Sequence, residues 1–327
     1  MSSPLVSFVV LSYNFAPFLE ECIASILNQE HNYDIEIVLV DDASSDDSDV
    51  VLRSFQDRRI TVIRHERNLG HIATVTDGLS HARGKYIARI DGDDRYQPTF
   101  LSHVVPILES HPEVGLTYGD AAIMDERGIV NAPQSDRVHN GTFYKGNEFV
   151  ALLEQNFICA PTIIARRETW LRCLPIPAGL AFHDWYFTLM IARCHDFYYI
   201  NHVLADYRVH SGNHHTRVIR DKSEEPSILR ILDGVFGERE SSPILQRRKE
   251  KARRRIYARH YVTLGDKYFG LQMNEDARRC YAAALQRRPS HLLNAGLVRR
   301  LAATLVGRAR YDAGKTIVKA ALGRSIR

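Results

Sequence analysis

The sequence predicts an α/β fold in which a mostly parallel central sheet is flanked by helices and followed by a small all-α region. Two observations carry this prediction. Strand-like and helix-like segments alternate through residues 6–90, and a β-α-β order builds parallel sheets through helical crossovers. Residues 6–12 form a largely apolar run, as a strand buried on both faces does. With 327 residues the chain has room for one large and one smaller domain.

Local signals place the individual elements. Four strands are expected at 6–12, 35–40, 60–64 and 85–90, separated by helices at 17–29, 44–55 and 72–82. Pro17 lies near the start of the first helix, where its missing N–H costs little, and Gly84 follows the end of the third. After Pro98 the alternation loosens, and we expect helices at 100–110, 146–155 and 181–194 and strands at 114–118, 161–165 and 197–209.

Composition restricts the cellular setting. The five cysteines form no C-x-x-C pair, which argues against a disulfide framework or a structural zinc site and favours a reducing compartment. Residues 1–13 lack the basic start and the small-residue cleavage site of a secretory leader. No apolar stretch is long enough to span a bilayer. We therefore expect a cytoplasmic protein, with peripheral attachment to the inner face of the membrane as an option.

Charge is distributed unevenly along the chain. Residues 245–327 hold 21 Lys and Arg against 5 Asp and Glu, a net charge of +16, which leaves −12 for residues 1–244. A basic region favours an anionic partner such as a membrane surface, nucleic acid or an acidic polymer. The alternative is a solvated helical face or a surface that docks on the acidic body. We expect peripheral membrane or homodimer contact through residues 246–327, and no nucleic acid.

Three carboxylates lie within four positions in the run Asp91-Gly92-Asp93-Asp94, directly after the fourth strand. Such close like charges repel unless a cation or a proton intervenes. Carboxylate oxygens suit Mg²⁺ or Mn²⁺, which bridge proteins to phosphates. The alternative is a solvated acidic turn. Polar residues also end the first strand, at 12–14, and the second, at 41–42. In this fold class ligands bind at that edge of the sheet, so the coincidence favours a metal site for a phosphorylated substrate.

The motifs that carry a family resemblance occur in a fixed order. They are residues 6–14 (VSFVVLSYN), 40–44 (VDDAS), 68–70 (NLG), 91–94 (DGDD), 183–185 (HDW) and 207–210 (YRVH). Together they strongly resemble family 2 glycosyltransferases of the GT-A fold, a Rossmann-like architecture, over roughly residues 5–215. The resemblance implies a nucleotide-diphospho-sugar donor, a divalent metal and inversion of the anomeric centre. One departure is His183, which stands where the family's acceptor motif usually has an acidic residue.

The resemblance also assigns roles to the metal and catalytic candidates. Asp93 is expected to bind the metal, and Asp91 to assist the metal or face the ribose. His210 would complete the metal shell or contact the diphosphate, with Arg208 nearby as a charge clamp. Asp184 is expected to be the general base. Helix capping is the alternative for Asp184, and a plain surface position is the alternative for His210.

The remaining candidates would bind the nucleotide. Asp42 is expected to accept a hydrogen bond from the base, and Ser12 and Asn14 to line the pocket. The alternatives are local: Asp42 would cap the turn into the next helix, and Ser12 or Asn14 would cap the first helix. Two roles are open for Asp94: a support for the metal ligands, or an N-cap for the segment after Pro98.

The domain prediction follows from these boundaries: a GT-A catalytic domain at 1–220, a linker at 221–245 with one helix inside it, and a basic helical region at 246–327. Residues 258–291 resemble a single tetratricopeptide repeat, with Gln272 where the repeat usually has a glycine. One such hairpin cannot form a solenoid. We expect it to pack on the catalytic domain or to pair in a dimer.

The sequence as a whole predicts a metal-dependent, inverting, hexosyltransferase-type enzyme. It would move a sugar from a nucleotide-diphospho-sugar to a hydroxyl of a glycan or lipid-linked acceptor, in surface polysaccharide or glycan assembly. One alternative is a sugar-1-phosphate nucleotidyltransferase, although the residues after the first strand lack the Gly-rich basic loop expected of one. The other is a catalytically silent scaffold that acts through its basic tail, which the retention of Asp93 and Asp184 disfavours.

Overall fold

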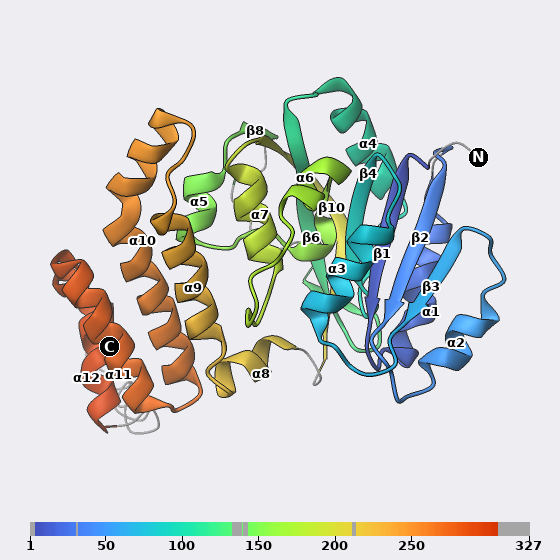
Figure 1. Ribbon diagram of the computed structural model, residues 1–327. Helices are drawn as coiled ribbons and strands as arrows, with labels where there is room; N and C mark the ends of the chain where they lie inside the picture. Colours follow the sequence, from blue (N-terminus) through green and yellow to red (C-terminus); the bar gives the residue numbers. More distant parts are fainter. Residues whose placement is uncertain (1–3, 31, 133–138, 140–142, 211–213, 307–327) are drawn as a thin grey trace, which may run out of the picture. The chain divides into compact units, whose positions relative to one another are not determined.

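A computed structural model describes residues 4–30, 32–132, 139, 143–210 and 214–306 (Figure 1). The chain forms two compact units. The first comprises residues 1–152 and 156–213, and the second comprises residues 153–155 and 214–327. Within the described residues, no helix combines the length and the apolar character needed to cross a membrane.

The first unit contains a ten-stranded sheet and the helices around it. The strands are β1 (Val6–Ser12), β2 (Ile35–Asp41), β3 (Ile60–Arg64), β4 (Tyr86–Asp91), β5 (Arg95–Tyr96), β6 (Val114–Asp125), β7 (Val130–Ala132), β8 (Tyr144–Gly146), β9 (Ile164–Arg166) and β10 (Asp196–Val209). The helices are α1 (Ala16–Leu27), α2 (Ser48–Ser54), α3 (His71–His81), α4 (Phe100–Ser110), α5 (Phe149–Glu154), the 3-10 helix η1 (Ala160–Thr162), α6 (Arg167–Arg172) and α7 (Asp184–Ala192).

The sheet has the order β3-β2-β1-β4-β9-β6-β10-β5, with β7 beside β6 and β8 beside β10. β1, β2, β3 and β4 pair in parallel, and β10 is parallel to β6, whereas the short β9 runs antiparallel to both β4 and β6. The predicted mostly parallel sheet is therefore confirmed. The register sets Ser12 beside Asp41 and Leu11 beside Asp91. The polar ends of β1, β2 and β4 thus meet at one edge, where the chain reverses its strand order.

Helices cover both faces of this sheet, so the central strands are buried on both sides. The side chains of Phe8 and Val10 face a core that includes residues of α1 and α4. Val9 points to the opposite face, where a Cβ added at Gly78 of α3 would lie only 2.4 Å from Val9 Cγ1. In Figure 1, α3 lies in front of the sheet and α1 behind it. This alternation explains the largely apolar sequence of β1.

Among the elements whose bounds differ from the prediction, α2 and β6 do so for identifiable reasons. α2 begins at Ser48 rather than near residue 44, because the polar residues before it bind groups of the loop, although Asp46 Oδ1 also accepts from the backbone N–H of Ser48 at 3.1 Å. Asp46 Oδ2 accepts from the backbone N–H of Ala16 at 2.9 Å, and Ser44 Oγ bonds to Asp41. β6 extends to Asp125, well beyond the predicted 114–118, because it pairs along most of its length with β10.

The second unit is helical in its described part. Its elements are α8 (His214–Arg220), α9 (Glu224–Gly237), α10 (Pro243–Gly270), α11 (Asn274–Arg287), the 3-10 helix η2 (Pro289–Leu293) and α12 (Ala295–Val306). The helix expected inside residues 221–245 is α9, and it belongs to this unit, where Leu232 and Val235 are buried. The division into a linker and a separate tail stays a prediction.

α10 and α11 form the predicted helical hairpin within residues 258–291. A Cβ added at Gly265 of α10 would lie 2.6 Å from Tyr281 Cε1 of α11, so the two helices approach closely there. Gln272, between them, has a positive φ of 64°, the backbone conformation that a glycine adopts most easily. The hairpin is therefore observed, while its kinship with tetratricopeptide repeats is not confirmed.

Candidate functional site

The acidic turn after β4 brings its three carboxylates together. Asp91, Asp93 and Asp94 each offer an oxygen within 4.8 Å of the others. Gly92 N–H donates to the backbone oxygen of Leu11 at 2.8 Å, and Asp94 N–H to that of Asp91 at 3.1 Å, which fixes the turn against β1. Burial and the charges of Asp93 and Asp91 raise the pKa of Asp94 well above its usual range. The turn is therefore not the solvated loop of the alternative interpretation.

Arg208, on β10, fixes the acidic turn through hydrogen bonds from its backbone and its side chain. Its backbone N–H donates to Asp94 Oδ1 at 2.8 Å, and its Nε donates to the backbone oxygen of Asp93 at 2.7 Å. The same guanidinium bonds to Glu21 of α1 and lies 4.7 Å from the centre of the Phe18 ring. Arg208 is 1% exposed. The expectation of a charge clamp on the diphosphate is therefore wrong, because protein groups already occupy this guanidinium.

Asp94 is not the N-cap of the following helix either. That helix, α4, has Thr99 at its N-cap position, whereas the Asp94 carboxylate is bound to the Arg208 backbone. Asp94 therefore joins the acidic turn to β10 through this hydrogen bond.

His210 lies next to the acidic turn, as the sequence predicts. Its Nε2 is 3.0 Å from Asp93 Oδ2, and its side chain is only 11% exposed. The ring packs near Phe18, with centroids 5.1 Å apart. The plain surface histidine of the alternative is thus excluded. The position suits either a hydrogen bond that orients Asp93 or a share in binding a cation.

Asp42, at the end of β2, is buried and fully engaged. Its Oδ1 accepts from the backbone N–H of Leu69 at 2.7 Å, and its Oδ2 from that of Gly70 at 2.8 Å. Gly70 has a φ of +85°, which favours glycine. The NLG motif, residues 68–70, therefore forms a loop whose backbone N–H groups bind the Asp42 carboxylate. The expected hydrogen bond from a nucleobase to the Asp42 carboxylate stays a prediction.

His65 joins Asp42 to α3 and is a residue that the sequence prediction missed. Its Nδ1 lies 2.7 Å from Asp42 Oδ1, and its Nε2 lies 2.9 Å from Asp77 Oδ2. Burial opposes ionisation of this ring, yet the hydrogen bonds and charges of Asp42 and Asp77 raise the pKa of His65 above its ordinary value. The sequence contained a signal for this residue, because His65 is a polar residue directly after β3, at the same edge of the sheet as Asp42.

Asn14 and Ser12 lie at the end of β1. Asn14 has a φ of +58°, and its Oδ1 accepts from the backbone N–H of Ser45 at 2.8 Å. It ties the loop after β2 to β1 and does not cap α1, whose first N–H is bound by Asp46. Ser12 Oγ is buried and lacks a hydrogen-bond partner among the described residues. Such an orphaned hydroxyl is the kind of group that a ligand satisfies.

Asp184 is the first residue of α7, and the N-cap position belongs to His183. The capping alternative for Asp184 therefore does not hold. Asp184 Oδ2 accepts from Asn156 Nδ2 at 2.9 Å. Burial comes first in raising the pKa of Asp91, and the charges of Asp93 and Asp184 add to it against the lowering effect of Arg89. Asp184 thus acts electrostatically on the acidic turn from a separate element.

His183, the departure from the family motif, is 5% exposed. Its ring stacks on that of His71, with centroids 5.2 Å apart and an angle of 24° between planes, and meets the Phe187 ring edge-on. An acidic residue at this position would have to be buried beside two rings. His71 begins α3 directly after the NLG loop, so this pair connects the acceptor motif to that loop.

The donor set of the acidic turn fits a hard divalent cation. The groups are carboxylate oxygens, they are mutually close, and their charge is only partly offset by Arg89, whose Nη2 bonds to Asp91. Mg²⁺ and Mn²⁺ prefer such oxygen ligands and bridge them to phosphates. The acidic edge of the sheet can therefore bind an anionic group through a cation. A further carboxylate, that of Asp184 on α7, acts electrostatically on the same turn.

Comparisons with known proteins identify the family of this chain. A family model described as Glycosyl transferase family 2 matches residues 7–174. An uncharacterized protein of Mycobacterium tuberculosis is 28% identical over 256 residues, 73% of this chain and 71% of that protein. An uncharacterized glycosyltransferase of Haemophilus influenzae is 34% identical over 133 residues, 39% of this chain and 41% of that protein.

Solved structures share the architecture. S. aureus TarS 1–349 in complex with UDP-GlcNAc has a TM-score of 0.64 at 16% identity, over 91% of this chain and 90% of that one. Mannosyltransferase PcManGT from Pyrobaculum calidifontis, in complex with GDP-Man and Mn²⁺, has a TM-score of 0.60 at 19% identity, over 97% and 84%. At these identities the likeness shows the fold alone, and it confirms the expected GT-A architecture.

Proposed function

The chain belongs to glycosyl transferase family 2, and on that premise we propose that it transfers a sugar from a nucleotide-diphospho-sugar to an acceptor hydroxyl, inverting the anomeric carbon. One observation carries the proposal: the carboxylates of Asp91, Asp93 and Asp94 converge at the carboxyl edge of the sheet, and the charge of Asp184, on α7, acts on Asp91. UDP-GlcNAc and GDP-Man, each bound by a protein of similar fold, support a nucleotide sugar as donor.

Asp93 and Asp91 would hold Mg²⁺ or Mn²⁺, with His210 beside Asp93. When bound, such an ion neutralises the charge that develops on the leaving diphosphate. The chain's own contribution is position: Arg208 fixes the backbone of the turn, and the bond from Arg89 restrains Asp91. Ser12 Oγ, which has no partner among the described residues, is available to the nucleotide.

Asp184 would take the proton from the acceptor hydroxyl. The acceptor oxygen attacks the anomeric carbon while the bond from that carbon to the diphosphate oxygen breaks, and the hydroxyl proton passes to the Asp184 carboxylate. The hydrogen bond from Asn156 to Oδ2 leaves Oδ1 to receive it. Because attack and departure occur on opposite faces, one displacement inverts the configuration.

The acceptor class is proposed as a glycan or a lipid-linked saccharide, in assembly of a surface polysaccharide or another glycan on the cytoplasmic side of a membrane. Contact with the membrane or with a second copy through residues 246–327 belongs to the same proposal. The excess of basic residues in that segment supports it.

Release of nucleotide tests the activity. The purified full chain is incubated with a panel of UDP-, GDP- and other nucleotide sugars, with Mn²⁺ or with a chelator, and free nucleoside diphosphate is measured. We expect slow metal-dependent release from one or a few donors. Release of pyrophosphate from a nucleoside triphosphate and a sugar 1-phosphate would instead identify a nucleotidyltransferase. Turnover of none of these would favour the scaffold.

A further inference from the structure

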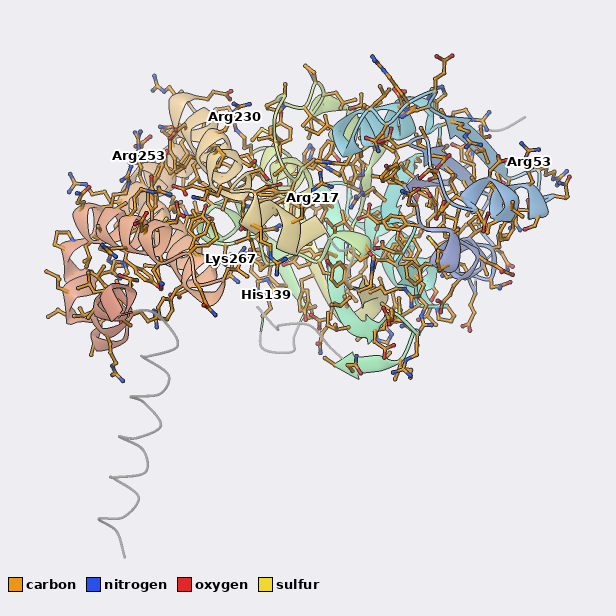
Figure 2. The ribbon with its side chains drawn as sticks, turned by 90° about the horizontal axis from the view of Figure 1, so that it is seen from below. Arg53, His139, Arg217, Arg230, Arg253 and Lys267 are labelled. Atoms are coloured by element: carbon orange, nitrogen blue, oxygen red, sulfur yellow. The ribbon has the colours of Figure 1, made fainter. Side chains whose placement is uncertain are left out.

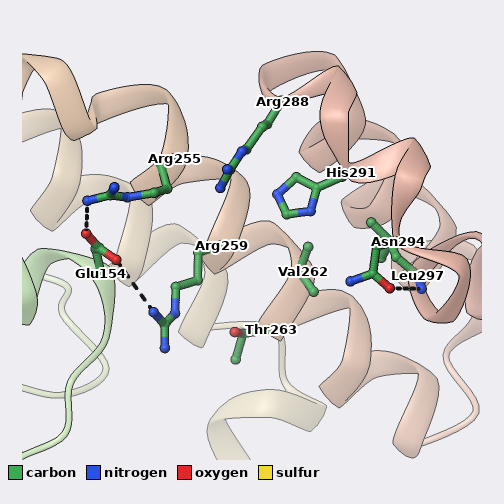
Figure 3. A pocket seen from close by; sticks show the side chains of 9 residues that line it. All are labelled: Glu154, Arg255, Arg259, Val262, Thr263, Arg288, His291, Asn294 and Leu297. Atoms are coloured by element: carbon green, nitrogen blue, oxygen red, sulfur yellow. Dashed lines mark hydrogen bonds and ion pairs between the residues drawn. The ribbon is translucent and has the colours of Figure 1, made fainter.

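We propose that the second unit contains an anion-binding pocket that takes a phosphate or diphosphate group. The pocket has a volume of about 310 Å³ and is lined by Glu154 and by residues of α10, η2 and α12, together with Arg288 and Asn294 on either side of η2 (Figure 3). Its polar lining includes Arg255, Arg259, Arg288 and His291. This site is separate from the acidic edge of the sheet, and its test does not depend on the proposed transfer reaction.

The pocket carries more positive than negative charge. Glu154 is the one carboxylate in the described lining; it bonds to Arg255 and lies 3.5 Å from Arg259. A guanidinium has five N–H donors, so this shared pairing orients both arginines and leaves donors for a ligand. About half of each of these arginine side chains is exposed, so a ligand can reach them.

Arg288 supplies the uncompensated charge. Its Nε donates to Ser290 Oγ at 3.2 Å, and no carboxylate pairs with it in the part of the chain that the structure describes. In Figure 3 its guanidinium extends from beyond the end of α11 toward α10, where Arg255 and Arg259 lie. Glu154 offsets one of the three positive charges around the cavity, and a further anion would reduce the repulsion that remains.

Three other basic side chains of this unit have carboxylates of their own. Lys249 pairs with Glu240 at 2.6 Å, Arg279 with Glu225 at 2.6 Å and Arg300 with Asp266 at 2.8 Å. Figure 2 shows further basic side chains, such as those of Arg230 and Arg253, on the surface of α9 and α10. The pocket differs because its surplus charge surrounds a cavity.

His291 adds an independent observation. Its Nε2 is buried and has no hydrogen-bond partner among the described residues. Burial and the charge of Arg288 lower the pKa of this ring, so the neutral form, with one N–H donor, prevails near neutral pH. Buried polar atoms in proteins are satisfied by a protein group, a ligand or an ordered water, so this nitrogen adds a polar group to the wall of the pocket.

The arginines determine the class of ligand. The planar guanidinium fork matches two oxygens of a phosphate, and binds it more specifically than an ammonium does. Stacking platforms for nucleobases are aromatic, and in the described lining His291 supplies the only ring. The phosphate of a lipid headgroup and that of a soluble molecule share this chemistry, so the experiment separates them.

Calorimetric titration with inorganic pyrophosphate tests the pocket. The full chain is titrated in the presence of a chelator, so that the acidic turn, without a cation, repels the probe. We expect Arg288→Gln and His291→Leu to bind pyrophosphate about tenfold more weakly than the unmodified chain, since each removes a hydrogen bond to a charged group. Arg254→Gln is the matched control, because Arg254 is an exposed arginine of α10 outside the pocket.

Vesicle binding then identifies the source of the phosphate. Phosphatidylcholine vesicles that contain phosphatidic acid are compared with vesicles of equal charge that contain phosphatidylserine. Loss of phosphatidic acid binding in Arg288→Gln, but not in Arg254→Gln, assigns the pocket to a lipid headgroup. Loss of pyrophosphate binding alone assigns it to a soluble ligand. No pyrophosphate binding by the unmodified chain, or equal losses in the pocket variants and in Arg254→Gln, would overturn the proposal.

Discussion

Arg208 Nε donates a hydrogen bond to the backbone oxygen of Asp93 at 2.7 Å. This contact joins β10 to the acidic turn across 115 positions of the chain, and the Arg208 backbone holds Asp94 in addition. Arg208, which the sequence predicted to contact the diphosphate, thus stabilises the turn that carries the carboxylates. Because the turn is fixed before any ligand arrives, less conformational entropy is lost when one binds.

Replacement of this support should destabilise the fold. Arg208→Met removes the bonds to Asp93 and Glu21 and leaves buried acceptors without partners, so we expect the free energy of unfolding to fall by about 3 kcal/mol or more. Urea unfolding measures the loss. Arg127→Met is the control, since the Arg127 side chain is 78% exposed and should change stability by less than about 0.5 kcal/mol. Equal effects of the two variants would contradict the bracing role.

Gly70 should tolerate a methyl group poorly. Its φ of +85° and ψ of 160° form a conformation that is populated almost only by glycine and costs an L-residue about 1–3 kcal/mol, and its N–H donates to Asp42. Gly70→Ala is therefore expected to lower the unfolding free energy and weaken donor binding. Gly234→Ala, in the interior of α9 with nothing within 4 Å of the added Cβ, should instead raise stability by about 0.5–1 kcal/mol. Thermal unfolding of both variants distinguishes backbone strain from a general effect of added methyl groups.

His65 should make stability depend on pH. Its pKa is raised in the folded protein by Asp42 and Asp77, although burial acts in the opposite sense. The charged form is then stabilised by folding, so the contribution is fully present below pH about 6.5. It disappears as the pH rises through the folded pKa. Urea unfolding of the unmodified chain and of His65→Asn, between pH 5.5 and 9, should show a stability difference that shrinks with rising pH. A difference that grows with pH would refute this assignment.

Asp184→Asn should separate binding from catalysis. The amide cannot accept the proton, so we expect transfer to slow by about 10²–10⁴-fold, while donor affinity measured by titration stays unchanged. Asp34→Asn, at an exposed position before β2, controls for the loss of one negative charge. Normal turnover by the Asp184 variant would exclude this residue as the base.

The sequence was sufficient to predict the meeting of β1, β2 and β4, because parallel strands bring their carboxyl ends to one edge and polar residues marked each end. The same logic applied to β3 would have found His65. Other features depended on distant contacts. Arg208 stands beside His210 in a motif that resembles a ligand site, and its burial depends on Glu21 and on the carbonyl groups of the turn, which no local pattern reveals. Likewise, Asp46 caps α1 from another loop.

The most direct test of the central claim is a thermal-shift titration of nucleotide-diphospho-sugars with and without Mn²⁺, on the unmodified chain and on Asp93→Asn. A ligand that binds the folded state raises its melting temperature by mass action. We predict that a donor raises the melting temperature of the unmodified chain only when Mn²⁺ is present, and that Asp93→Asn shows no such shift. The same Mn²⁺-dependent shift in the Asp93→Asn variant, or none with any donor in the unmodified chain, would contradict a metal-dependent donor site at this turn.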